Sequence, residues 1–125
     1  MIGVVAALNA REGERTHGFT FVGAKGPGQD LFVSFHDLRL SAQRRAAHYA
    51  AAGLARGDRV ALIIPEGEHF IPAFLGALWN GLVPVPLYPP VSLGKLDAFM
   101  DALVSILNVA TPRVLVTSER VAKVL

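Results

Sequence analysis

Apolar and polar residues alternate along this chain in blocks that switch between strand-like and helix-like spacing. The aromatic and β-branched run Phe19–Val22 predicts a strand, Gly23–Asp30 a glycine-rich turn, and Leu31–Ser34 a returning strand. Together these segments predict a β-hairpin. The apolar residues Ile2–Ala10 predict a short helix or an arm, and the mixed charges of Arg11–Arg15 predict a solvated connection.

A helix is predicted directly after the hairpin, ending near Ala52. Ser34 and Asp37 have the spacing of a capping box, with Asp in place of the usual Glu or Gln. Gly53 supplies the helix stop. Apolar residues at helical spacing define one buried face, which consists of Leu38, Ala42, Ala46 and Tyr49.

The segment Arg59–Pro65 predicts a strand. Its core, Val60–Ile64, is continuously apolar, which is typical of a parallel strand buried on both faces. Glu66–Trp79 follows as a helix that is apolar nearly all round, so deep burial is expected. Pro72 fits that helix only near its first turn or at a kink, and Gly76 predicts close approach to a neighbouring element.

The C-terminal part repeats the alternation of strands and helices. Leu82–Leu87 predicts an edge or irregular strand because its two prolines lack backbone donors, and Tyr88–Pro90 ends regular structure. Lys95–Asn108 predicts a helix, Val114–Thr117 a strand, and Glu119–Leu125 a last helix of two turns. The apolar face of the Lys95–Asn108 helix consists of Leu96, Phe99, Met100, Leu103 and Leu107.

This order predicts the α/β class, with an N-terminal β-hairpin followed by βαβ units around a partial parallel sheet. We expect residues 1–15 to form an N-terminal arm and residues 16–125 to form one incomplete subdomain. Hydrophobic residues make up 52% and charged residues 18%, so the chain is either a membrane protein or part of a larger globule. Its apolar runs of about ten residues are interrupted by prolines, whereas a membrane-spanning helix needs about 20.

Charge and cysteine content narrow the function classes further. The net charge is +2 with acids and bases mixed along the chain, which does not favour a nucleic-acid partner. Cysteine is absent, so no disulfide framework exists, and a cytoplasmic location is expected. The apolar start Met1–Ala10 has no basic segment before it, which argues against a signal peptide.

Two short motifs suggest binding but are better explained as turns. Gly23, Gly26 and Gly28 form a glycine-rich loop, but a phosphate loop needs a strand before it and a helix after it. This loop joins two strands, so we expect a hairpin turn. The tripeptide Arg56–Asp58 has the sequence that integrins recognise. It lies between a predicted helix and a core strand, where Gly and Asp are ordinary turn residues.

The titratable residues form no catalytic pattern. Asp97 and Asp101 lie four apart, as paired carboxylates can, but they occupy the polar face of an amphipathic helix near its N-terminus. Ser34 is expected to cap a helix, and no nucleophile elbow is present. The dispersed histidines are not expected to bind metal: His17, His36, His48 and His69. We therefore predict no catalytic, cofactor-binding or metal residue in this chain.

Several motifs occur in an order that resembles the N-terminal part of adenylate-forming, AMP-binding enzymes. They are Val33–Leu38 (first core motif, with Asp37 for Glu), Gly57–Leu62, Phe74–Gly81 (with Asn80 for the common Ala), Pro84–Pro90 and Pro112–Ser118. The resemblance covers about residues 16–125. Within that superfamily, Pro86–Pro90 is similar to fatty acyl-AMP ligases, which are related to long-chain fatty acid–CoA ligases.

The resemblance implies a parent ligase that converts fatty acid and ATP, with Mg²⁺, to an acyl-adenylate and pyrophosphate. The acyl group then passes to the thiol of an acyl carrier protein or of CoA. In the family, the phosphate loop, the adenine and ribose motifs and the catalytic lysine follow later. The chain is thus expected to be truncated and inactive alone, to hold no cofactor, to need the remainder of the ligase domain, and to self-associate through its open sheet edge.

Two alternatives stay open at this point. The chain could be a non-catalytic interaction or dimerisation module derived from the same fold. Alternatively, its parent could be a coenzyme A synthetase or an amino-acid adenylation domain. The residues that separate these classes, including an insertion that blocks coenzyme A transfer in acyl-AMP ligases, are not in this sequence.

Overall fold

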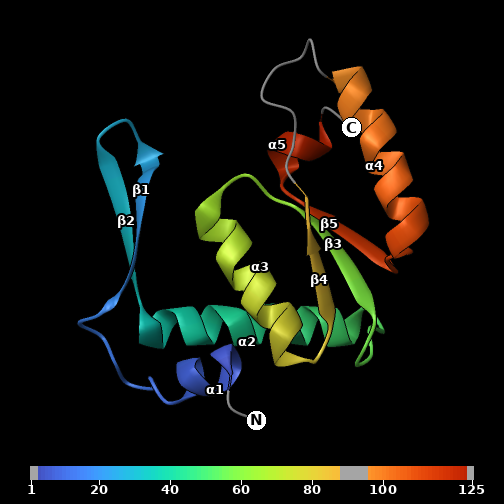
Figure 1. Ribbon diagram of the computed structural model, residues 1–125. Coiled ribbons are helices and arrows are strands. Elements are labelled where there is room, and N and C mark those ends of the chain that lie inside the picture. Colours follow the sequence, from blue (N-terminus) through green and yellow to red (C-terminus); the bar gives the residue numbers. More distant parts are fainter. Residues whose placement is uncertain (1–2, 88–95, 124–125) are drawn as a thin grey trace.

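A computed structural model describes residues 3–87 and 96–123, without the side chain of Leu96 (Figure 1). The chain folds into a β-hairpin and a parallel sheet with helices around them. In chain order, the elements are α1 (Val4–Asn9), β1 (Gly18–Gly26), β2 (Gln29–Ser34), α2 (Phe35–Ala51), β3 (Arg59–Ile63), α3 (Gly67–Trp79), β4 (Val83–Pro86), α4 (Leu96–Ala110), β5 (Val114–Thr117) and α5 (Glu119–Ala122). The predicted α/β class and its order of elements are confirmed.

The parallel sheet has three strands in the order β4-β3-β5. The central strand β3 pairs with β4 from Arg59↔Val83 and with β5 from Val60↔Val114. The proline-bearing strand β4 lies at one edge, as predicted, because its prolines cannot donate to a second neighbour. The chain goes from β3 to β4 on one side and then crosses to β5 on the other.

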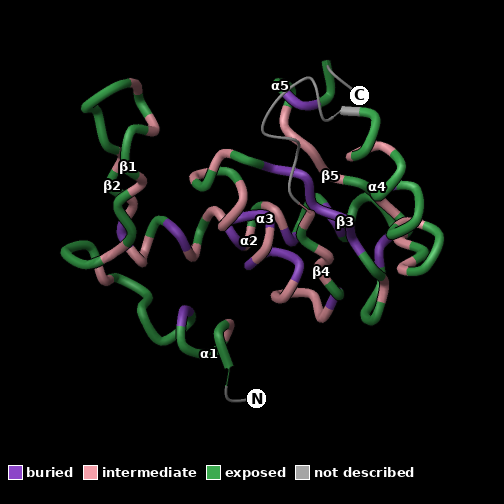
Figure 2. The backbone as a smooth tube through the Cα atoms, turned by 45° about the horizontal axis from the view of Figure 1, so that its top comes forward, coloured by how far each residue is buried: buried purple, intermediate pink, exposed green. Residues whose placement is uncertain are grey.

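Helices cover both faces of the sheet, with α2 and α3 on one side and α4 on the other (Figure 1). The central strand is buried on both faces, as its continuous apolar run predicts (Figure 2). Leu62 packs in a cluster with Tyr49 and Ala73, while Ile63 packs in another with Leu103. The α4 face predicted from periodicity packs on this second cluster through Phe99, Met100, Leu103 and Leu107.

Helices α2 and α3 cross at very close range at Gly76. A Cβ atom at this position would lie 2.6 Å from Arg45 Cβ and 2.9 Å from the carbonyl oxygen of Ala42. The close approach predicted from Gly76 is therefore confirmed. Nearby, the Tyr49 hydroxyl donates a hydrogen bond to the Ala73 carbonyl at 2.9 Å, and burial raises the pKa of this tyrosine.

The hairpin of β1 and β2 projects from the rest of the molecule (Figure 1). Its antiparallel register runs from Gly18↔Ser34 to Phe21↔Leu31, then shifts before Gly26↔Gln29. The predicted turn Gly23–Asp30 is thus too long, because the strands continue through an irregular segment and leave only Pro27 and Gly28 between them.

The N-terminal segment is held against the start of α2. The backbone N–H of Gly13 donates to Nδ1 of His36 at 2.9 Å, and Leu8 of α1 is buried. The Glu14 carboxylate accepts hydrogen bonds from the Thr16 hydroxyl at 2.6 Å and from the backbone N–H groups of Thr16 and His17. These bonds, that of the Thr16 hydroxyl first, lower the pKa of Glu14 to about 2.

Pro72 is the sixth residue of α3, so the Glu68 carbonyl lacks its usual helical donor. Two other predictions need correction. Helix α3 is buried along one side only, since Phe70, Phe74, Leu78 and Trp79 are half-buried. Helix α5 spans Glu119–Ala122, one turn where two were predicted. The predicted stop at Tyr88–Pro90 lies outside the described residues.

None of the helices in the described ranges combines the length and apolarity needed to cross a membrane.

Candidate functional site

A polar crevice opens beyond the carboxyl ends of β3 and β5. The strand order reverses between these two strands, because the chain goes from β3 to β4 on one side and β5 lies on the other side of β3. Crevices of this kind, at the point where strand order reverses, are the usual ligand sites of open α/β sheets. The crevice here has a volume of about 550 Å³, which lies within the range of ligand pockets.

Residues from both strand ends and three helices line the crevice. The strand ends contribute Ile64 and Glu66 after β3, and Thr117 and Ser118 at and after β5. The helices contribute Arg45 from α2, His69 from α3, and Glu119, Arg120 and Lys123 from α5 and its end.

Hydrogen bonds join the two strand ends across the crevice. The Thr117 hydroxyl donates to the Ile63 carbonyl at 2.7 Å, and the Ser118 hydroxyl donates to Oε1 of Glu66 at 3.3 Å. The same Ser118 oxygen accepts from the backbone N–H of Val121 and so caps α5. Within the described residues, the buried Oε2 atom of Glu66 has no hydrogen-bond partner. The hydrogen bonds of Thr117 and Ser118 thus hold the two strand ends together.

The charged side chains around the crevice are mainly basic. Arg45, Arg120 and Lys123 bring three positive charges, against the carboxylates of Glu66 and Glu119. Lys123 and Glu119 lie 3.8 Å apart, but both side chains are highly exposed, so this pair is weakly coupled. A crevice with this balance favours an anionic ligand over a cationic one.

Among the described residues, the crevice shows no nucleophile hydrogen-bonded to a histidine. A nucleophile needs a hydrogen-bonded base, and the Ser118 hydroxyl donates to Glu66 and to no histidine among the described residues. In the same ranges, no group of three or more His, Cys, Asp or Glu side chains could hold a metal ion. What this arrangement can do is bind and orient a ligand.

The sequence of this chain matches the family model for AMP-binding enzymes over residues 10–125. The chain belongs to the AMP-binding enzyme family. Its relatives include the long-chain fatty acid–AMP ligase FadD23 of Mycobacterium tuberculosis, 42% identical over 67 residues, which cover 54% of this chain and 11% of the relative. The long-chain fatty acid–CoA ligase FadD13 of the same species is 38% identical over 61 residues, which cover 49% of this chain and 12% of the relative.

Solved structures of AMP-binding enzymes resemble the chain over nearly its whole length. A structure from a study of fatty acyl-adenylate ligases of E. coli and L. pneumophila matches with a TM-score of 0.82 and 28% identity, covering 93% of this chain and 20% of that one. The fatty acid AMP ligase of Legionella pneumophila matches with a TM-score of 0.80 and 26% identity, over 95% and 20%. The chain therefore spans about a tenth of the length of these curated relatives and a fifth of these solved structures.

The motifs that resemble AMP-binding enzymes lie where helices and strands begin or end. Val33–Leu38 spans the end of β2 and the start of α2, where the Ser34 oxygen accepts from the backbone N–H of Asp37 at 3.1 Å, as predicted for a cap. Phe74–Gly81 ends α3. Asn80, which replaces the common Ala, donates from Nδ2 to the Ala46 carbonyl at 2.6 Å. This departure from the family pattern adds a tie between α3 and α2.

The two motifs that suggested binding belong to the hairpin and to a turn. Gly23 and Gly26 lie in β1 and Gly28 lies between the two strands, and all three have positive φ. In Arg56–Asp58, the Asp58 carboxylate accepts from the backbone N–H of Ala55 at 2.7 Å and lies 3.1 Å from Nη1 of Arg113. This carboxylate ties the turn before β3 to the residue before β5.

The titratable candidates are not brought together. Asp97 and Asp101 are exposed on α4. The histidines are dispersed, with His17 beside Glu14, His36 at the start of α2, His48 exposed near the end of α2, and His69 exposed on α3. Only His69 reaches the crevice.

Sequence reasoning did not identify the crevice residues Arg45, Glu66, Ser118 and Arg120. A usable signal was present, because Glu66 and Ser118 each follow an apolar strand by only a few residues. Polar residues just beyond the carboxyl ends of parallel strands gather at one edge of a sheet. Arg45 carried no such signal, since it lies in the polar pattern of a helix.

Proposed function

We propose that this chain forms the first part of the AMP-binding domain of a ligase that activates long-chain fatty acids. The ligase would convert fatty acid and ATP to an acyl-adenylate and pyrophosphate, and then pass the acyl group to a thiol of a carrier protein or of CoA. The observation that carries the proposal is the match to fatty acyl-AMP ligase structures over 93–95% of the chain at 26–28% identity. Matches to keto acid-selecting adenylation domains, at 20% identity, concern the fold alone.

The proposed role of this part is to build one wall of the larger enzyme. Its family motifs cap helices and close turns, and its crevice offers positive charge without a nucleophile–base pair. The chemistry would then depend on the remainder of the ligase domain, and residues 16–125 would dock against it as one subdomain, with residues 1–15 as an arm. We also propose a cytoplasmic location, which the absence of cysteine supports.

Such a reaction requires Mg²⁺ to offset phosphate charge. The described residues include no group of three or more His, Cys, Asp or Glu side chains that could hold a metal ion. Its ligands would come from other parts of the ligase, and no step of the reaction is assigned to this chain through the metal.

A chimeric enzyme tests the proposed function. This chain would replace the matching fifth of the Legionella pneumophila fatty acid AMP ligase, and pyrophosphate release would be measured with ATP and a long-chain fatty acid. We expect release by the chimera and none from the 125-residue chain alone. A folded chimera that released no pyrophosphate, or turnover by the isolated chain, would contradict the proposal.

Self-association is expected for the isolated chain, because β5 leaves one edge of the sheet open and Leu115 on it is 40% exposed. Light scattering after gel filtration should show a mass that rises with concentration towards twice that of the monomer. Leu115→Lys should restore the monomer, since charged side chains block edge pairing. The matched control, Val22→Lys on the exposed hairpin, should not. A monomer at millimolar concentration would rule the idea out.

A further inference from the structure

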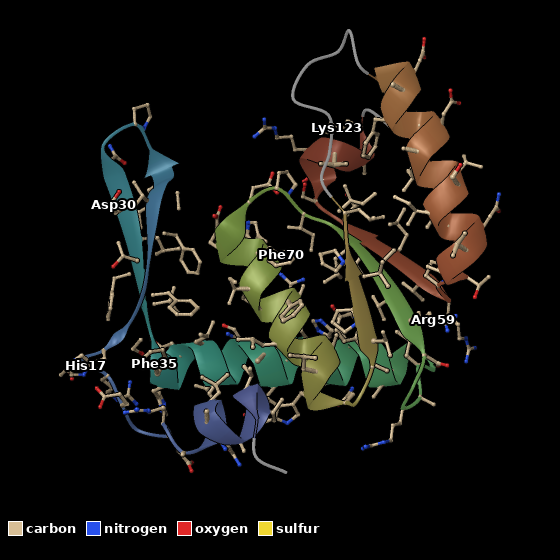
Figure 3. All side chains as sticks on the ribbon, viewed as in Figure 1. His17, Asp30, Phe35, Arg59, Phe70 and Lys123 are labelled. Atoms are coloured by element: carbon tan, nitrogen blue, oxygen red, sulfur yellow. The ribbon has the colours of Figure 1, made fainter. Side chains whose placement is uncertain are left out.

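An apolar groove lies on a different part of the molecule from the polar crevice, and the two share no lining residue. It is formed where α1 meets the base of the hairpin and the crossing of α2 and α3, close to Phe35, which Figure 3 labels at the start of α2. Its volume is about 380 Å³, which is within the range of small-molecule pockets.

The groove has a packed floor and an open rim. Leu8, Leu38 and Leu75 form the floor and are all buried. Val4 and Phe19 stand at the rim and are 56% and 40% exposed. Nine of the ten lining residues are apolar, so the groove offers almost no hydrogen-bonding partner to a polar ligand.

Arg11 is the single charged residue in the lining. Its guanidinium carbon lies 5.9 Å from the centroid of the Phe35 ring, a cation–π distance that holds the side chain over the groove. Among the described residues, no carboxylate forms an ion pair with Arg11. The groove therefore combines a long apolar surface with one positive charge that is available to an anion.

We propose that this groove binds one free long-chain fatty acid, with its alkyl chain along the floor and its carboxylate on Arg11. An apolar lining takes up alkyl surface from water, and a guanidinium pairs with a carboxylate through two parallel hydrogen bonds. The choice of a fatty acid among anionic amphiphiles rests on the proposed function, although the groove is separate from the crevice described above.

A single charge in an otherwise apolar lining argues for an amphiphile with one anionic head as the occupant. An alkyl chain is thin and adapts its torsions to the lining. A second copy of the chain would have to place a carboxylate on Arg11 and an apolar surface in the groove at the same time.

Calorimetric titration of the 125-residue chain with laurate below its micelle concentration, and with dodecanol below its solubility limit, tests the proposal. We expect one laurate per chain. Ala7→Phe, which fills an exposed lining position on α1, should weaken binding of both ligands at least tenfold. The matched control Ala6→Phe, exposed on the same helix but outside the lining, should bind as the parent does.

The headgroup contact is tested separately. Arg11→Gln should weaken laurate binding about fivefold, near the upper end for an exposed ion pair, and leave dodecanol binding unchanged. Arg15→Gln, in the same loop but outside the lining, is its control. Thermal unfolding of each variant checks that the fold is kept.

The proposal would be overturned if the parent and Ala7→Phe bound laurate equally, or if Ala6→Phe weakened binding as much as Ala7→Phe does. It would also be overturned if Arg11→Gln weakened dodecanol binding as much as laurate binding. Loss of dimer formation in Ala7→Phe without any laurate binding by the parent would instead identify the groove as a contact between copies. The titration contains no ATP, so a negative titration would not contradict the proposed ligase function. An inactive chimera would likewise not contradict fatty acid binding in the groove.

Discussion

Replacing Gly76 with valine is expected to destabilise the chain by about 3 kcal/mol, because this position lies at the closest point between α2 and α3. A Cβ atom there would lie 2.6 Å from Arg45 Cβ and 2.9 and 3.1 Å from backbone atoms of Ala42 and Ala46. Backbone atoms cannot swing aside as a flexible side chain can, so the two helices would have to separate.

Gly76→Ala combines two opposing effects on stability, a gain in helix propensity and a steric clash between the helices. Alanine favours a helix over glycine by about 1 kcal/mol, so a spacious site would gain stability from this change. We expect a loss of about 1–2 kcal/mol instead, since even the single methyl group meets Arg45 Cβ and the Ala42 carbonyl.

Urea unfolding followed by helical circular dichroism would measure both Gly76 variants. Gly67→Ala is the matched control, because it lies in the same helix and its added Cβ would meet Phe21 at 3.4 Å, an ordinary contact. Its stability should stay within about 0.5 kcal/mol of the parent. If Gly76→Val unfolded at the same urea concentration as Gly67→Ala, the helices would not be in the close contact described.

Leu62→Ala should cost about 3–4 kcal/mol. Leu62 is fully buried at the centre of β3 and packs in one cluster with Tyr49, Ala73 and Ala77. Removing most of its side chain loses the transfer free energy of the buried methyl groups and leaves a cavity between the sheet and the two helices.

The control for Leu62 is Leu115→Ala on the neighbouring strand β5. Leu115 is 40% exposed, so the same change should cost less than about 1 kcal/mol. Urea midpoints should separate the two variants while the slope of unfolding free energy against urea stays the same. Equal costs would mean that Leu62 is not the better buried of the two.

Local patterns predicted most of the elements because their cause is local. The run Val60–Ile64 identified the central strand, and the spacing of Leu38, Ala42, Ala46 and Tyr49 identified the buried face of α2. The Ser34 cap and the tight contact at Gly76 followed from single residues whose chemistry has few other uses.

The crevice and the apolar groove could not be predicted in the same way, because each joins segments far apart in sequence. Glu66 and Ser118 are bonded across 52 residues, and no spacing rule connects them without the strand order. Likewise, Arg11 and Phe35 meet only because the hairpin brings the N-terminal segment back to α2. The extent of β1 was misjudged because its glycines signal a turn, although positive φ is equally compatible with an irregular strand.

The position of β3 between two later strands has a consequence for biosynthesis. Its partner β5 follows about 54 residues later, as the bond between Ile63 and Thr117 shows. At ribosomal rates of about 5–20 residues per second, the apolar central strand waits about 3–11 s for that partner to emerge. During this interval a nascent chain exposes an unpaired edge of its most apolar strand, so shielding of that edge on the ribosome should govern how much of the protein reaches its native state.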